Sequence, residues 1–130
     1  THQYLIFDPN LMKVSQETQL LFPCAAWGTA LSQSLQDFGL TFCGEWSVAA
    51  DDCALYLNGV GGKSAYDGSC ANCTCVGAND WENWTPQKKA FLRQFTEVQM
   101  DALEMGNGWF FWTWKTENNI NPVWDYQLGL

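Results

Sequence analysis

Three short, predominantly apolar runs divide this chain, and they constrain its fold more than any other feature. The runs cover residues 1–7, 40–46 and 109–114, and the last of them reads Trp-Phe-Phe-Trp-Thr-Trp. Strands that are almost wholly apolar are typical of parallel sheets covered on both faces. Helical patterns separate the runs, and strands that alternate with helices pair in parallel through crossover connections. The sequence therefore predicts an α/β fold with a parallel sheet.

Three of the expected helices lie in the first half of the chain. A short helix at 15–21 should end near Pro23, because proline disrupts a helix interior. A second helix should cover 25–38, where leucines and a phenylalanine recur at intervals of four and three residues. A third is expected at 47–57, directly after the second apolar run. These helices would supply the crossovers between the strands.

The best-defined helix covers 85–105. Thr85 is a good N-cap and Pro86 suits the first helical position. The apolar residues of this segment form one stripe, which would face the core. Residues after 114 show no periodic pattern and are expected to form a loop. The apolar stripe consists of Phe91, Phe95, Val98 and Ala102.

The composition is that of an acidic chain of domain size. The chain has 130 residues, of which 47% are hydrophobic, and a net charge of −8, so we expect one domain portion over 1–130. The charge repels phosphate backbones, which argues against nucleic acid as a partner. No apolar run approaches about 20 residues, so no membrane span is expected. The eight tryptophans suit core packing, and they also suit sugar binding, since pyranose rings stack on flat aromatic faces.

The cysteines cluster around a long loop at 59–78 that is rich in glycine and serine. Two N-glycosylation sequons begin at Asn72 and Asn83, and together with the cysteines they favour a secreted protein, extracellular or in a cell wall. Disulfides are favoured over a metal site because the only histidine is His2, and neither a metal nor another cofactor is expected. Six cysteines allow about 15 full pairings, and a mixture of bridged and free thiols is equally open. The cysteines are at positions 24, 43, 53, 70, 73 and 75.

Candidate functional residues stand where the predicted strands end. Ligands of parallel α/β folds bind at the carboxyl ends of strands, and Glu45 occupies such an end on an otherwise apolar run. A carboxylate at this place is costly to bury without partners, so it should face a cleft. His2 and Tyr4 lie two apart and share a face, as do Trp112 and Trp114. Core packing could explain each of these residues taken alone. Their occurrence together at the ends of three predicted strands favours a ligand-binding or catalytic site.

Four blocks of the sequence resemble, in order and spacing, the fungal exo-1,3-beta-glucanases of glycoside hydrolase family 5. The resemblance extends over essentially the whole chain and implies the (β/α)8 TIM-barrel fold of that family, with the three apolar runs as strands six to eight. Residues 1–130 would then be the C-terminal portion of a catalytic domain. The blocks are His2-Gln3-Tyr4, Cys43-Gly44-Glu45-Trp46-Ser47, Leu57-Asn58-Gly59-Val60 and Phe111-Trp112-Thr113-Trp114-Lys115-Thr116-Glu117.

The same resemblance implies roles for individual residues. Glu45 would be the catalytic nucleophile, with His2 and Tyr4 lining its pocket and the Tyr4 hydroxyl hydrogen-bonded to the carboxylate. Trp112 would form the stacking platform beneath the sugar, and Phe7 would lie near the entrance that holds the leaving glucan. The substrate-binding residues implied in this way are Trp112, Phe7, Trp46 and Trp114.

A retaining glycosidase also needs an acid/base carboxyl group, which in this family follows an asparagine as an Asn-Glu pair. No such pair occurs in this sequence. Three strands cannot close a barrel of about 250 residues, so the chain alone should be inactive and should associate through its open sheet. The expected partners are a beta-glucan or oligosaccharide, and either the missing N-terminal half of the barrel or a second copy.

Two other functions are compatible with the sequence. A secreted lectin-like protein could have kept the aromatic platform without catalysis, which the tryptophan content favours. A small secreted protein stapled by disulfides and acting through protein contacts would explain Cys70, Cys73 and Cys75 and the acidic surface. Sugar binding, detected by tryptophan fluorescence, separates the first from the second.

Overall fold

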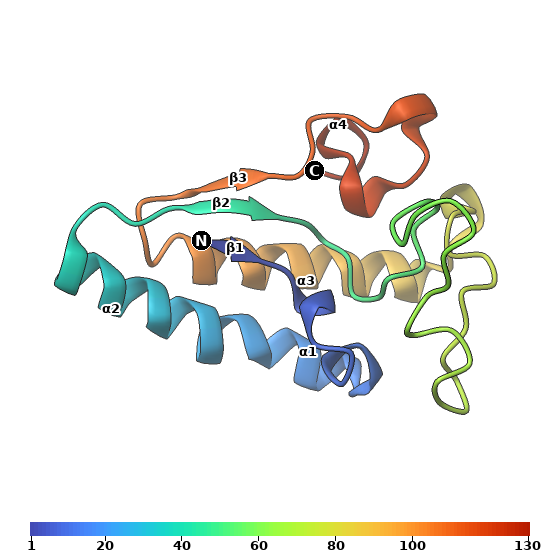
Figure 1. Cartoon of the computed structure of the whole chain (residues 1–130), viewed down its shortest axis with the longest axis horizontal. Helices are drawn as coiled ribbons and strands as arrows, with labels where there is room; N and C mark the ends of the chain where they lie inside the picture. The colour runs from blue at the N-terminus through green and yellow to red at the C-terminus, as the bar shows by residue number, and fades with distance from the viewer.

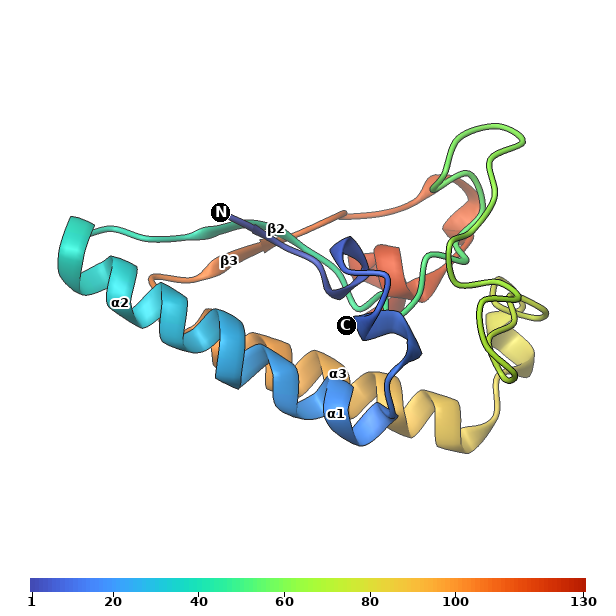
Figure 2. The same ribbon diagram turned by 60° about the horizontal axis from the view of Figure 1, so that its bottom comes forward.

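The computed structural model describes all residues, 1–130, as a three-stranded parallel sheet with helices packed against one face (Figures 1 and 2). The strands are β1 (His2–Gln3), β2 (Cys43–Trp46) and β3 (Trp109–Phe111), in the order β1-β2-β3. Both neighbouring pairs are parallel. The α/β class and the parallel sheet predicted from the sequence are confirmed, while the sheet remains open.

The strands are shorter than the apolar runs that predicted them. In the run over 1–7 only His2–Gln3 forms a strand, and Leu5–Phe7 forms the 3-10 turn η1, which closes with a 3.2 Å hydrogen bond onto the carbonyl of Tyr4. This turn directs Leu5 into the core, where it is almost fully buried. The strand in 109–114 likewise covers only its first half. Two further 3-10 turns are η2 (Leu11–Lys13) and η4 (Trp81–Asn83).

One long helical segment connects β1 to β2. It consists of α1 (Gln16–Phe22), the π-helical segment η3 (Pro23–Gly28) and α2 (Thr29–Phe38), and it ends at Gly39 with φ 91°. The α-helix thus ends at Phe22, beside Pro23 as predicted, but the chain stays helical through η3 where a break was expected. Proline lacks an N–H and its ring crowds the preceding turn, and the wider π-helical turn accommodates it without ending the helix. Ser15 caps the beginning, as its hydroxyl accepts the Thr18 amide at 3.2 Å.

The helix α3 (Pro86–Leu103) confirms the prediction for this part of the chain. The hydroxyl of Thr85 accepts the Lys88 amide at 3.1 Å, which satisfies one of the free donors at the helix start. Phe91 and Phe95 lie buried and stacked with ring centroids 5.7 Å apart. The apolar stripe thus faces the core, as its spacing predicts.

The helix predicted at 47–57 does not form. This segment consists of turns and bends, and Tyr56 has a positive φ of 65°. Asp51 accepts the Cys53 amide, which a helix here would need, at 3.1 Å, and Asp52 accepts the Ala65 amide of the following loop at 2.7 Å. Such local side-chain bonds compete with helical hydrogen bonding and explain the error.

Disulfides close the loop that follows. Cys53 pairs with Cys75, and Cys70 pairs with Cys73, which confirms the prediction of disulfides among these cysteines. Cys24 and Cys43 remain free, the first exposed and the second buried, so both bridged and free thiols occur. No helix of the structure combines the length and the apolar character that a membrane crossing requires.

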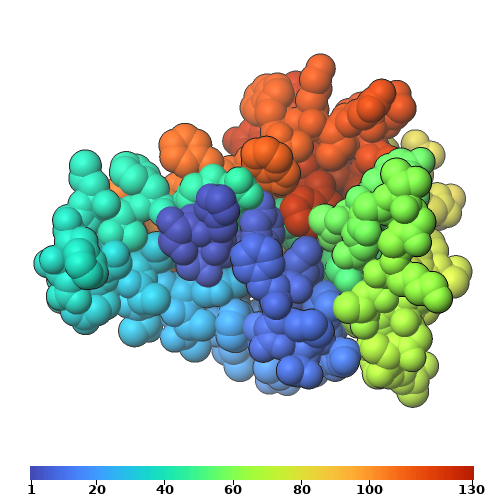
Figure 3. All heavy atoms as spheres, in the orientation of Figure 1, coloured from blue at the N-terminus to red at the C-terminus, as the bar shows by residue number.

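The C-terminal segment folds into short helical turns, where a loop was expected. They are η5 (Glu117–Asn119), η6 (Pro122–Trp124) and α4 (Tyr126–Gly129). Asp125 organises them, because its fully buried carboxylate accepts hydrogen bonds from the amide and hydroxyl of Thr116, at 2.7 and 2.8 Å. Figure 3 shows this segment, coloured orange to red, beside the green disulfide loop.

The core lies between the sheet and the helices. Trp46 is its centre, fully buried and in edge-to-face contact with Trp109 and Phe111, at centroid distances of 5.2 and 5.1 Å. The opposite side of the sheet has no helical layer. Phe110 and Trp112 are exposed there although both are large and apolar.

Candidate active site

A bulge in β2 directs Glu45 away from the core. Cys43 pairs with Trp109 and Trp46 pairs with Phe111, so three steps along β2 match two along β3. Regular strands alternate their faces, and residues three apart would point to opposite sides. Instead Cys43 and Trp46 are both fully buried, while the side chain of Glu45 is 30% exposed. Bulges re-aim side chains next to active sites in this way.

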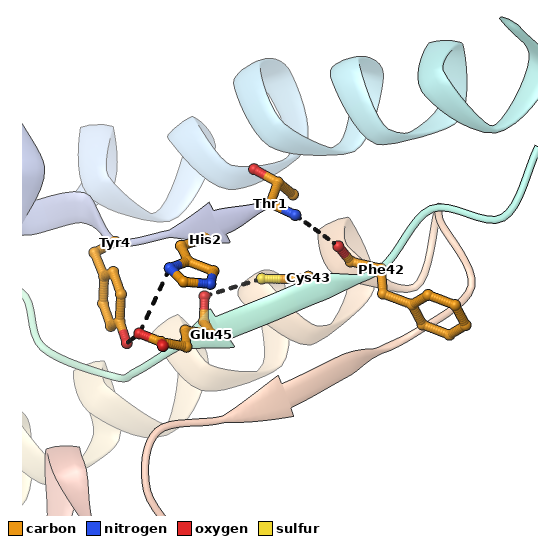
Figure 4. Close-up of polar contacts among 6 residues, drawn as sticks. All are labelled: Thr1, His2, Tyr4, Phe42, Cys43 and Glu45. Atoms are coloured by element: carbon orange, nitrogen blue, oxygen red, sulfur yellow. Dashed lines mark hydrogen bonds and ion pairs between the residues drawn. The ribbon is translucent and has the colours of Figure 1, made fainter. Parts of the chain in front are cut away.

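The carboxylate of Glu45 meets two side chains from the neighbouring strand. The Tyr4 hydroxyl donates a hydrogen bond to Oε2 at 3.0 Å, and Nδ1 of His2 lies 3.7 Å from the same oxygen. His2 is the register partner of Glu45 in the parallel pair, which accounts for its approach. Figure 4 shows the three side chains converging from β1, the residue after it, and β2. The sequence-based grouping of these residues is therefore observed in the structure.

Tyr4 is a fixed donor in this group. It is 8% exposed, and its ring packs against Phe7 at 5.0 Å and Trp124 at 5.6 Å between centroids. Burial, the hydrogen bond to Glu45 and the charge of that carboxylate all raise the pKa of the Tyr4 phenol. The phenol therefore stays protonated over the whole physiological pH range and can donate its hydrogen bond to Glu45 throughout.

The backbone around Glu45 is held from both sides. The thiol of Cys43 donates to the carbonyl of Glu45 at 3.1 Å, and burial raises the pKa of that thiol, so it stays neutral (Figure 4). Gly44 leaves the room that the His2 ring occupies, because a Cβ at position 44 would lie 3.3 Å from two ring atoms. A larger residue would displace the imidazole.

The predicted sugar platform lies beside this group. Trp112 is about half exposed and lines a hollow of about 220 Å³, whose other walls include Trp124 and residues 54–57. Its amide donates to the Trp46 carbonyl at 2.8 Å, which extends the pairing of β2 with β3. Trp112 forms no hydrogen bond with Glu45, whose side-chain partners are Tyr4 and His2. Instead, Trp124 contacts the Tyr4 ring and lines the same hollow as Trp112, and so connects the two.

The other predicted substrate-binding residues have different environments. Phe7 is 68% exposed beside Tyr4, and Trp114 is exposed and stacks on Tyr126 with centroids 5.3 Å apart. Trp46, by contrast, lies in the core with no exposed surface, where a substrate cannot reach it. The prediction of a sugar contact for Trp46 is at odds with this position. Neighbouring residues of a strand face opposite sides, so Trp46 cannot share the face of Glu45, and the bulge turns it into the core together with Cys43.

The sequence analysis missed Trp124 and two asparagines. Asn121 caps the turn that carries Trp124, accepting the Val123 amide at 3.1 Å, and donates to Asn79 at 3.0 Å. Asn79 in turn donates to the carbonyl of Cys53 at 3.2 Å. The one available signal was the Asn-Pro pair at 121–122, which is typical of a capped helical turn.

The predicted glycosylation sites, Asn72 and Asn83, are both exposed. Asn72 lies within the short ring closed by the Cys70–Cys73 disulfide. The side-chain amide of Asn83 donates to Asp80 at 3.0 Å.

The arrangement is suited to nucleophilic chemistry at an exposed carboxylate. Glu45 is partly exposed, is oriented by a permanent donor and has no salt bridge to lysine or arginine. Its side-chain partners are Tyr4 and His2, and no second carboxyl group is among them. No cluster of side chains suited to a metal ion is present.

The chain is similar in sequence to curated fungal proteins, although no protein-family model matches it. The chain is 38% identical over 130 residues to a glucan 1,3-beta-glucosidase of Candida oleophila. It is 37% identical over 133 residues to a probable glucan 1,3-beta-glucosidase A of Aspergillus niger, and 35% identical over 147 residues to a probable glucan 1,3-beta-glucosidase D of Aspergillus clavatus.

These matches cover 97 to 99% of this chain but only 29%, 31% and 18% of the respective relatives. The chain therefore corresponds to less than a third of the length of each of these proteins. Over nearly its whole length, this chain is similar in sequence to the fungal glucan 1,3-beta-glucosidases, which confirms the resemblance found in its sequence blocks.

Proposed function

We propose that this chain carries the nucleophile of a retaining glycoside hydrolase that acts on beta-1,3-glucan. The hydrogen bond from Tyr4 to Glu45 supports the proposal most strongly, because it orients an exposed carboxylate on an otherwise apolar sheet. The names of the relatives supply the substrate class. Hydrolysis by double displacement needs such a carboxylate to attack the anomeric carbon.

In the proposed reaction, one oxygen of Glu45 forms an ester with the sugar while the glycosidic oxygen leaves with a proton. Tyr4 donates its hydrogen bond to the second carboxylate oxygen, Oε2, and limits rotation of the carboxylate. His2 lies beside it, with Nδ1 3.7 Å from the same oxygen. Trp112, exposed beside the Trp124 hollow, would stack under the sugar ring. Phe7 and Trp114 would contact neighbouring units of the glucan. Water then hydrolyses the ester.

The acid/base that protonates the leaving oxygen would come from outside these 130 residues. Retaining enzymes hold the two carboxyl groups about 5–5.5 Å apart. We place β1, β2 and β3 as strands six to eight of a family 5 (β/α)8 barrel, whose remaining strands would cover the open face that exposes Phe110 and Trp112. A second copy of the chain is the other candidate for covering that face, since open apolar sheets associate.

Secretion is part of the proposal. Two disulfides are stable in oxidising compartments, and both sequon asparagines are exposed for glycosylation. Extracellular space or the cell wall is also where a beta-glucan substrate would be met. Mass analysis of the natural protein before and after enzymatic removal of N-glycans tests this assignment.

A fluoro-sugar that forms a slowly hydrolysed ester with the nucleophile tests the proposed reaction. The full-length protein should become labelled on the peptide that contains Glu45. The same treatment of the Glu45→Gln variant should leave that peptide unlabelled. A label on another carboxylate in the unmodified protein would disprove the assignment of Glu45.

A carbohydrate-binding protein without catalysis is the second candidate. The exposed aromatic surfaces of Trp112 and Trp114 favour it, because flat rings bind sugars without any catalytic group. Titration with beta-1,3-gluco-oligosaccharides, followed by tryptophan fluorescence, tests binding. Saturable binding by full-length protein that neither hydrolyses the glucan nor accepts the label would favour this candidate over the hydrolase.

A further inference from the structure

The position of the Tyr4 ring controls the contact with Glu45, and two aromatic neighbours bound that ring. Phe7 is 68% exposed and has little around it to hold it in place. Trp124 is half-buried and lies over the ring at 31° with centroids 5.6 Å apart. Of the two neighbours, Trp124 is therefore the one that can hold the Tyr4 hydroxyl at its 3.0 Å distance from the carboxylate.

Trp124 is itself fixed by its backbone. Its carbonyl accepts the Thr113 amide at 2.9 Å, and its own amide donates to the Asn121 carbonyl at 3.1 Å. The Asn121 side chain is 4% exposed and caps the same turn by accepting the Val123 amide at 3.1 Å. The turn that carries the tryptophan is thus held at both ends.

A partly buried amide pair, formed by Asn121 and Asn79, then connects this turn to the disulfide loop. Nδ2 of Asn121 donates to Oδ1 of Asn79 at 3.0 Å, and that oxygen also accepts the Leu55 amide at 3.2 Å. Nδ2 of Asn79 donates to the carbonyl of Cys53, which is covalently bonded to Cys75. The amide pair links two segments 42 residues apart in the sequence.

We propose that Trp124 is a positioning residue for the nucleophile, acting through Tyr4, and that Asn121 and Asn79 hold it in place. The inference rests on the proposed hydrolase function, and it adds that the rate of hydrolysis depends on Trp124 although this residue does not contact Glu45 through a hydrogen bond. Small displacements of catalytic groups reduce rates by up to about 100-fold. The disulfide loop would thereby support Glu45 indirectly, because Asn79 connects it to Asn121 and so to the turn that carries Trp124.

Kinetics of the full-length protein on a beta-1,3-gluco-oligosaccharide test the proposal. Trp124→Leu should lower kcat by about 10-fold or more with a smaller change in KM, and Trp124→Phe, which keeps an aromatic ring, should recover most of the loss. Trp81→Leu removes another half-buried tryptophan, one that lines a separate groove beside α3, and should leave kcat unchanged. Equal losses in the two leucine variants would contradict a role specific to Trp124.

The decisive comparison is a double-mutant cycle. If Trp124 acts through Tyr4, Trp124→Leu should add little further loss in a Tyr4→Phe background, because the bond that it orients is already gone. Losses that multiply would overturn the proposal. Should the Trp124→Leu protein fail to fold, Asn121→Asp provides the same cycle, since it keeps the cap and loses the donation to Asn79.

Failure of the underlying function gives a different result. In that case Tyr4→Phe itself would leave the rate unchanged, and the fluoro-sugar would label a carboxylate other than Glu45. A Tyr4 effect together with labelled Glu45, but multiplying losses in the cycle, rejects the role of Trp124 alone. The two proposals are therefore distinguishable in one set of variants.

Discussion

The Tyr4 hydroxyl donates a 3.0 Å hydrogen bond to Oε2 of Glu45 across two segments that lie 41 residues apart in the sequence. Parallel pairing of β1 with β2 opposes His2 to Glu45, and the residue that follows β1 then reaches the same carboxylate. This contact joins the sheet topology to the proposed chemistry.

Removal of the Tyr4 hydroxyl should slow catalysis without unfolding the protein. A hydrogen bond to a charged group contributes about 1.5–3 kcal/mol, which corresponds to about 10- to 100-fold in kcat/KM. Tyr4→Phe should show this loss in steady-state kinetics of the full-length protein. Tyr66→Phe, at a tyrosine whose hydroxyl forms no hydrogen bond to the protein, should show none. An unchanged rate in Tyr4→Phe would contradict the role of the bond.

Substitution of Gly44 should act through the imidazole beside it. A Cβ at position 44 would lie 3.3 Å from two atoms of the His2 ring, so Gly44→Ala should displace that ring and slow labelling of Glu45 by about 3- to 10-fold. In a His2→Ala background the ring is absent, and the same substitution should have almost no further effect. A full Gly44→Ala effect in that background would show that the glycine serves another purpose.

The stability of the disulfide loop should fall in acid because of Asp52. Burial favours its neutral form, but hydrogen bonds from Ser64, Ala65, Tyr66 and Asn58 outweigh burial and hold the pKa below its ordinary value of 3.8. A lowered pKa in the folded state stabilises the protein above the unfolded value, and this contribution is lost as the pH falls through the folded value. Proteolysis of the loop should therefore accelerate below about pH 3.8.

The neighbouring aspartate provides the matched control for Asp52. Burial raises the pKa of Asp51, so its charge is unfavourable in the folded state at neutral pH. Asp52→Asn should lower the free energy of unfolding by about 2 kcal/mol at pH 7, whereas Asp51→Asn should be neutral or stabilising. Urea denaturation of both variants measures the difference. Equal destabilisation by the two variants would contradict the account of Asp52.

Replacement of Trp46 should reduce the stability of the protein much more than replacement of Trp112. Trp46 is fully buried in the core, so Trp46→Ala should cost about 3–5 kcal/mol of unfolding free energy. Trp112 is 51% exposed, and Trp112→Ala should change stability by only about 0.5 kcal/mol while it weakens glucan binding. Thermal unfolding and sugar titration of both variants check the pair. A stable Trp46→Ala protein with impaired binding would reverse the assignment of the two residues.

Several elements were predictable because local and tertiary forces agree in them. Thr85, Pro86 and the apolar stripe all favour the same helix, which became α3. Apolar runs that alternate with helices are typical of parallel strands, and these three runs form the parallel sheet of the structure. The grouping of His2, Tyr4 and Glu45 depends on that sheet and was predictable with it.

Other features depend on interactions that no local pattern reveals. The helix expected at 47–57 is absent because Asp51 and Asp52 bind backbone amides, one of them 13 residues away. The segment beginning at Pro23 stays helical by widening into π-helical turns. The bulge in β2 follows from pairing with β3, so alternation along the strand could not reveal that Cys43 and Trp46, three residues apart, both face the core.

The identity of the labelled carboxylate tests the central claim most directly. Full-length protein treated with a fluoro-sugar should yield one modified peptide, and fragmentation should locate the sugar ester on Glu45. Tyr4→Phe should slow the labelling by about 10- to 100-fold at the same position, because the carboxylate loses its fixed donor. An ester on any other residue, or labelling of Glu45 at an unchanged rate without Tyr4, would contradict this account of the site.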